Sequence, residues 1–112
     1  MCSIHKKTNN EELFEWLKLL NQVTEVSKDF PLVYKGQVPN VAVYLVNGKI
    51  AFSGTSSLLI DAKDPIIVGL TEIISRIPSK KNVVVLKGSQ ISILSLATLK
   101  NDIPDKILSN AI

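Results

Sequence analysis

The sequence of 112 residues contains only one cysteine, Cys2, and one histidine, His5. A single cysteine excludes an internal disulfide and a zinc site built on cysteines. A single histidine argues against a histidine-rich metal centre and against Ser-His-Asp catalysis. We therefore expect no metal, no cofactor and no enzymatic activity.

Long apolar runs are also missing. No segment approaches the 18 consecutive apolar residues of a membrane span, and polar residues follow Lys6 and Lys7 where a signal peptide would continue with its apolar region. We therefore expect a cytoplasmic protein without a membrane partner.

Positive charge is modest, with a net charge of +3, and aromatic residues make up 5% of the chain. Arg76, Lys80 and Lys81 form a small basic group without interleaved aromatic residues, which is typical of a solvated surface rather than of a nucleic-acid interface. We therefore expect no nucleic acid as a partner. Asp61, Asp64 and Glu72 have the chemistry to hold a hard cation, but we interpret them as loop or solvated carboxylates.

The chain is rich in aliphatic residues. Hydrophobic residues make up 46%, with 13 isoleucines and 11 valines, and such β-branched residues favour strands. The length supports one core, so we expect a single domain over residues 1–112, with residues 1–9 as a flexible N-terminal stretch.

The hydrophobic pattern predicts a helix, then strands, then helices again. Thr8 to Glu11 have the spacing of a capping box, and apolar residues at helical spacing, Trp16 among them as a core anchor, predict a helix over about 10–22. Predicted strands cover residues 30–34, 41–46, 49–53, 58–62, 66–68, 83–86 and 91–95. Asn47-Gly48 predicts a hairpin turn between the second and third of these.

Helical segments are predicted again in the second half of the chain. A short helix is expected over 71–77, ended by Pro78. Ser95 is expected to cap a last helical segment that is interrupted or restarted at Pro104. The fold class expected is therefore mainly β: a β-roll of jelly-roll, cupin-like form with an N-terminal helix and a short C-terminal helical segment.

Several spacings resemble those of one known family. Gly36, Tyr44 and Gly48 are spaced similarly to the turn, strand and hairpin of the cyclic-nucleotide-binding domain of the catabolite activator type. Val68-Gly69, a short apolar helix, Pro78 and residues 83–85 resemble its phosphate-binding cassette and return strand. Residues 91–95 resemble its last barrel strand. The resemblance covers residues 11–103 and implies a stand-alone, ligand-binding β-roll of that kind.

The same resemblance implies a cassette that lacks its key groups. In the family, backbone amides at the cassette helix hold the cyclic phosphate, an arginine pairs with it, and a glutamate directly after the glycine binds the ribose. Here Leu70 follows Gly69, and Ser79 follows Pro78. Each lost hydrogen bond to a charged group is worth roughly 1.5–3 kcal/mol. We predict a degenerate cassette in which Leu70 fills the space of the sugar; its candidate residues are Gly69, Leu70, Thr71, Glu72, Ser79, Lys80 and Lys81.

Two hypotheses for function follow. In the first, the domain binds no cyclic AMP and works as a protein-protein adaptor for a signalling or regulatory protein. In the second, it senses a cyclic nucleotide or another small anionic ligand through residues 69–71 with Lys80 and Lys81. For the first hypothesis, apolar residues in the C-terminal segment predict a partner surface at Leu99, Ile103, Lys106 and Ile107.

Because Pro104 divides that segment, we expect a monomer or a weak dimer.

Overall fold

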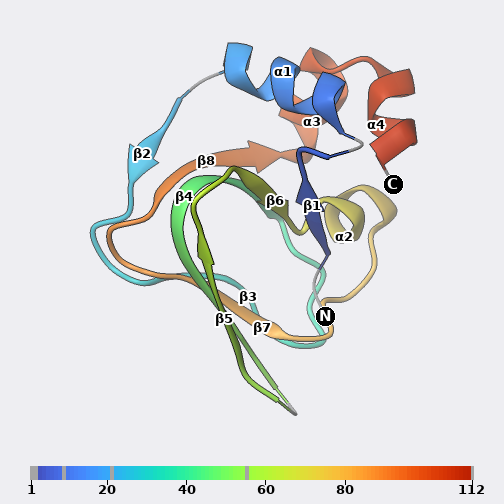
Figure 1. Ribbon diagram of the computed structural model, residues 1–112. Helices are drawn as coiled ribbons and strands as arrows, with labels where there is room; N and C mark the ends of the chain where they lie inside the picture. Colours follow the sequence, from blue (N-terminus) through green and yellow to red (C-terminus); the bar gives the residue numbers. More distant parts are fainter. Residues whose placement is uncertain (1–2, 9, 21, 55, 112) are drawn as a thin grey trace.

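The computed structural model describes residues 3–8, 10–20, 22–54 and 56–111, and over these the chain forms a β-roll with four helices packed against it (Figure 1). In chain order the elements are β1 (Ile4–Lys6), α1 (Glu11–Leu20), β2 (Thr24–Glu25), β3 (Phe30–Val33), β4 (Val41–Ser53), β5 (Leu58–Ala62), β6 (Ile66–Val68), α2 (Leu70–Ser75), β7 (Asn82–Val85), β8 (Gln90–Ser95), α3 (Leu96–Asp102) and α4 (Asp105–Ala111). The expected fold class, mainly β with helices at both ends, is confirmed. No helix of this described part is long and apolar enough to cross a bilayer.

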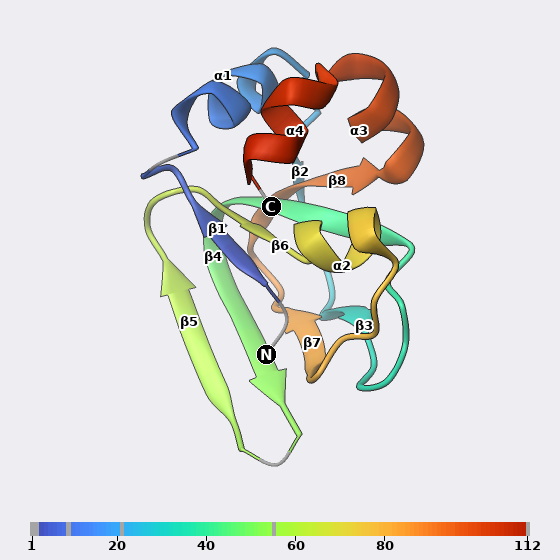
Figure 2. The ribbon, with the colours of Figure 1, turned by 90° about the vertical axis from the view of Figure 1, so that its right-hand side faces the viewer.

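Strand β4 organises the sheet, because it pairs with four other strands. Its first half lies between β6 and β8, and its second half lies between β5 and β7. All of these pairings are antiparallel, and β1, β2 and β3 extend the sheet beyond β6, β8 and β7 respectively. Figure 2 shows β4 bending from the helix-covered part of the roll toward the hairpin that it forms with β5.

The hairpin predicted at Asn47-Gly48 is wrong. The chain continues through these two residues within β4 and does not reverse its direction. The register of the pairing between β4 and β8 shifts between Leu45 and Asn47. Gly48 has a φ of 128°, and a Cβ placed there would lie 2.6 Å from the Cα of Ser89. The irregularity in the ladder therefore falls at Val46, directly before Asn47-Gly48, and the positive φ of Gly48 serves a strand that continues rather than a turn.

The roll has two apolar clusters on opposite sides of β4. Val43 and Leu45 belong to the cluster inside the roll, whereas Ala42 and Tyr44 belong to the cluster between the sheet and the helices. This alternation is the period of two that a strand imposes. We call the two clusters the roll-interior core and the helix-side core. Residues 42–45 are therefore buried on both faces of the sheet, and Trp16 packs half-buried against the helix-side core.

The helix ends agree with the predicted caps in part. The Oγ of Ser95 accepts a hydrogen bond of 3.1 Å from the amide of Thr98, so the predicted cap of α3 is confirmed. Pro104 separates α3 from α4. Helix α2 ends earlier than predicted because Arg76 adopts a left-handed conformation with φ 57°. Of the predicted capping box at the start of α1, Asn9 lies outside the described residues.

Two strands were not predicted. Residues 4–6, expected to be part of a flexible N-terminal stretch, form β1, which pairs with β6 from Ile4 opposite Val68 to Lys6 opposite Ile66. Residues 24–25 form β2 on the edge of β8. Both strands are too short to show an alternating pattern, and each exists only because a distant strand offers its edge. Met1 and Cys2 lie outside the described residues.

Candidate functional site

The first half of the predicted cassette begins where β6 passes into α2. Gly69 lies between them with φ 87° and ψ 9°, a left-handed conformation that glycine adopts without strain. Leu70 then points into the helix-side core and is completely buried. The apolar neighbours of Leu70 belong to the cluster under the helices, and the idea that Leu70 fills the space of a sugar stays a prediction.

The N-terminal segment of the chain occupies the backbone groups at the start of α2. The amide of Gly69 donates to the carbonyl oxygen of Ser3 at 3.0 Å, and the amide of Thr71 donates to the Oγ of Ser3 at 3.2 Å. Helix starts leave such amides without partners inside the helix, and an anion is one group that can satisfy them. Here Ser3 satisfies two of them instead.

Ser3 also binds the carboxylate of Glu72. Its hydroxyl donates to Oε1 at 2.6 Å, and its amide lies 3.2 Å from each carboxylate oxygen. Glu72 is only 6% exposed, so the interpretation of Glu72 as a loop or solvated carboxylate is wrong, and a buried carboxylate faces the same point as the amides of α2. A second anion entering here would meet this negative charge at short range.

The second half of the predicted cassette lies in the turn after α2 and has a structural role. Ser79 is 2% exposed, and its Oγ donates to the carbonyl oxygen of Lys81 at 2.7 Å. Its backbone joins it to the turn before β4: its amide donates to the carbonyl oxygen of Gln37, and its carbonyl oxygen accepts from Gly36, both at 2.8 Å. Ser79 therefore fixes two turns to each other.

The two lysines after Ser79 do not meet the start of α2. The Nζ of Lys81 donates to the Oγ of Ser56 at 2.8 Å, in the loop between β4 and β5, and Lys80 is exposed. Within the described ranges, neither lysine forms a hydrogen bond or ion pair with residues 69–72. The structure does not bring the two halves of the predicted cassette together as one charged site.

Cavities of appreciable size lie elsewhere on the molecule. Three of about 690, 670 and 650 Å³ are lined by other parts of the chain, and no candidate cassette residue lines any of them. Among the residues with described positions, no group of three histidine, cysteine, aspartate or glutamate residues could hold a metal ion.

The predicted partner surface is wrong for two of its four residues. Leu99 and Ile103 are buried in the helix-side core, because α3 and α4 lie against the sheet and α1. Ile107 is half-buried against the same cluster, and only Lys106 is exposed. Helical spacing showed that these apolar residues share a face, but it could not show that the roll covers that face.

Sequence comparison and structure comparison give different results. No protein-family model matches the sequence, and no curated protein matches it. Solved structures do match, at 12–15% sequence identity. Likeness to solved structures at this level of sequence identity shows a similar fold only.

Three solved structures illustrate the match. The Thermus thermophilus catabolite activator protein gives a TM-score of 0.58 at 15% identity, covering 90% of this chain and 50% of that chain. The regulatory domain of Toxoplasma gondii PKA with cAMP gives 0.58 at 12% identity, covering 92% and 48%. A structure from work on a cyclic-GMP-dependent signalling pathway that regulates bacterial phytopathogenesis gives 0.61 at 13% identity, covering 88% and 85%.

These matches confirm that the chain has the cyclic-nucleotide-binding-like fold that its spacings predicted. The chain spans about half the length of the catabolite activator protein and of the PKA regulatory chain that it matches.

Proposed function

We propose that this chain is a non-catalytic, cyclic-nucleotide-binding-like signalling module whose cassette is closed to cyclic AMP and cyclic GMP. In this proposal it acts in the cytoplasm as an adaptor or regulator, through contact with a signalling or regulatory protein. The observation that carries the proposal is the position of Ser3, which takes up amide groups at the start of α2 and the carboxylate of Glu72.

The charges around α2 support a closed cassette. A cyclic phosphate at the start of α2 would have to displace Ser3 from the amide of Thr71 and would then lie beside the carboxylate of Glu72. The only arginine of the chain, Arg76, is at the opposite end of α2 and caps its C-terminus. An anion here would therefore lose hydrogen bonds and gain repulsion without an ion pair in return.

The single histidine supports a role without catalysis. The Nε2 of His5 lies 2.6 Å from the carbonyl oxygen of Ala111, so this ring nitrogen donates and joins β1 to the end of α4. A histidine held in this way connects β1 to α4. It also lines the cavity of about 670 Å³, where no titratable group of the described residues forms a hydrogen bond with it.

Thermal denaturation with cyclic AMP or cyclic GMP at millimolar concentration tests the proposal. A ligand that binds the folded state must raise the melting temperature, and we expect no rise with either nucleotide. A rise that disappears in a Lys80→Ala, Lys81→Ala double variant would favour the alternative function, a sensor of an anionic small molecule. Lys100→Ala, a change of the same kind at an exposed position of α3, serves as the matched control.

A further inference from the structure

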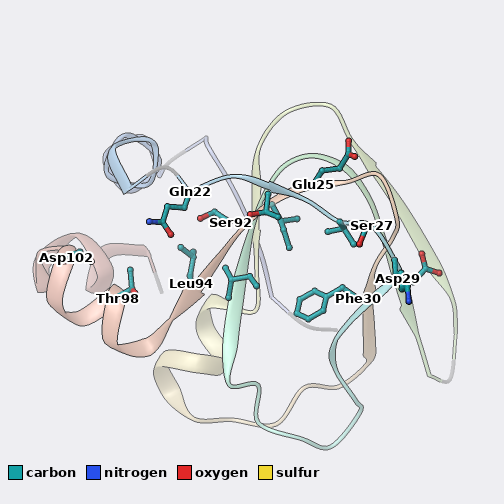
Figure 3. A pocket seen from close by; sticks show the side chains of 14 residues that line it. Gln22, Glu25, Ser27, Asp29, Phe30, Ser92, Leu94, Thr98 and Asp102 are labelled. Carbon is teal, nitrogen blue, oxygen red and sulfur yellow. The ribbon is translucent and has the colours of Figure 1, made fainter.

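One of the three larger cavities described above runs along the outer edge of β8, and Figure 3 shows the side chains that line it. It measures about 690 Å³ and lies between the segment of residues 22–30 on one side and β8 with α3 on the other. Four consecutive residues of β8, residues 91–94, line it. Consecutive strand residues point to opposite faces of a sheet, so a groove lined by all four lies along the edge of the strand rather than on one face.

The backbone of β8 lacks a second strand along this groove. On one side β8 pairs with β4 along its length, whereas on the other side β2 pairs with it only at Gln90 and Ile91. From Ser92 onward no strand of the described chain pairs with this side of β8. An edge of this kind presents amide and carbonyl groups that another extended chain can pair with.

The groove also offers an apolar contact beside that edge. Ile93 is 53% exposed, an unusual position for isoleucine in a strand whose neighbours Ser92 and Leu94 are buried. Half-buried Phe30 lines the same groove. An apolar side chain of an added strand would cover Ile93 and remove this surface from water.

Charge distinguishes among possible occupants. The groove is lined by three exposed carboxylates, those of Glu25, Asp29 and Asp102, and by one lysine, Lys28, although the chain as a whole carries a charge of +3. A symmetric dimer through this edge would bring the same acidic lining from both copies together, which like-charge repulsion disfavours. A nucleic acid is disfavoured for the same reason. A basic chain complements the lining.

We propose that this groove binds an extended peptide of a partner protein, with an apolar residue between basic residues, by addition of a strand to the edge of β8 at residues 92–94. The inference rests on the proposed adaptor function and identifies the surface and the kind of partner through which it acts. Main-chain hydrogen bonds provide the pairing, Ile93 provides the apolar contact, and the acidic lining selects the charge of the peptide.

The probe for a test is a capped synthetic peptide, Lys-Val-Lys-Val-Lys, titrated into the isotope-labelled full chain while backbone amide signals are recorded. We expect saturable shifts at Ser92, Ile93 and Leu94 that weaken as salt is added. A peptide of the same length, Glu-Val-Glu-Val-Glu, is expected not to bind. A Lys-Val-Lys-Val-Lys peptide N-methylated at its central residue, which lacks one amide donor, is expected to bind more weakly.

A matched pair of variants locates the contact. Ile93→Lys is expected to weaken the binding of the basic peptide by about tenfold or more, because the change removes the apolar contact and adds a positive charge. Ile77→Lys makes the same change at another exposed isoleucine outside the groove and is expected to leave binding unchanged. Equal melting temperatures for the two variants would show that both are folded.

Several results would overturn the inference: no binding by the basic peptide, equal binding by the acidic one, shifts confined to other strands, or full binding by Ile93→Lys. A tight dimer in light scattering that Ile93→Lys dissociates would overturn it too, because a second copy would then be the occupant. Each of these failures is distinct from failure of the proposed function, which depends on the response to cyclic nucleotides and not on this edge.

Discussion

The hydroxyl of Ser3 lies between the amide of Thr71 and the carboxylate of Glu72, accepting from the first at 3.2 Å and donating to the second at 2.6 Å. The residues it connects are 68 and 69 positions away in the sequence. One side chain therefore joins the N-terminal strand to the helix that a cyclic-nucleotide cassette would use. The pairing of β1 with β6 holds Ser3 in place for this contact.

Ser3→Ala tests this contact through stability. The change removes one donor to a buried carboxylate and one acceptor of a helix amide, so we expect a loss of about 1–3 kcal/mol in the free energy of unfolding, measured by chemical denaturation. Ser109→Ala, at an exposed position of α4, is the control and should change stability little. Equal stability of the two variants would mean that Ser3 does not hold Glu72.

Substitution of Leu70 tests its place in the helix-side core. Leu70→Ala should cost about 2–5 kcal/mol, the range for a buried leucine, whereas Leu19→Ala at a position that is 78% exposed should cost little. The double change Leu70→Glu with Ser79→Arg places two charges at buried positions, so we expect a strongly destabilised or unfolded protein and no gain of nucleotide binding. A stable double variant that binds cyclic AMP would contradict the packing described here.

Gly48→Ala and Gly36→Ala form a matched pair. Both glycines have positive φ, 128° and 89°, so both changes incur a backbone cost of about 1–2 kcal/mol. Only at Gly48 would the new Cβ overlap a neighbour, Ser89, and overpacking adds about 1–3 kcal/mol. Denaturation midpoints should therefore fall further for Gly48→Ala. Similar losses at both positions would argue against the close approach of Ser89 to the bulge.

Tyr44 predicts how stability depends on alkaline pH. Burial raises the pKa of its phenol above the ordinary value of 10.0, and the nearby Glu15 carboxylate adds to the rise. At a pH between the pKa of the unfolded chain and the higher pKa of the folded chain, the unfolded chain has released the proton while the folded chain keeps it. The contribution of Tyr44 to the free energy of unfolding is therefore complete below pH 10 and declines as the pH rises through the pKa of the folded state.

Tyr44→Phe should remove this part of the alkaline loss of stability. The ring contact with Phe14, edge-to-face at 5.8 Å between centroids, does not need the hydroxyl. Tyr34→Phe, the same change at an exposed position, is the control. An unchanged slope of stability against pH in Tyr44→Phe would contradict the assignment.

Local patterns predicted much of the fold. The sequence predicted the bounds of β5, the cap at Ser95 and the break at Pro104, because a short-range rule governs each of them. Asn47-Gly48 misled because the positive φ of Gly48 is compatible with a hairpin turn and with a continuous strand. Only the pairing of both halves of β4 with other strands decides between the two.

The site was less predictable than the fold. That residues 69–72 form the start of a short helix could be read from Gly69 and the residues after it. The sequence could not show that Ser3 occupies the start of this helix. A three-residue strand such as β1 has no sequence pattern of its own and depends on the open edge of β6. Burial of Leu99 and Ile103 likewise depends on how α3 and α4 lie over the sheet.

The most direct test of a cassette closed by Ser3 is a titration of the isotope-labelled chain with cyclic AMP and with cyclic GMP, followed through the backbone amide signals of Gly69, Leu70 and Thr71. The structure predicts that these signals stay in place up to millimolar nucleotide, because Ser3 already takes the amides of Gly69 and Thr71. Saturable shifts of these three signals, together with new exchange at Ser3 as it leaves Glu72, would contradict the account and show that the cassette opens to its ligand.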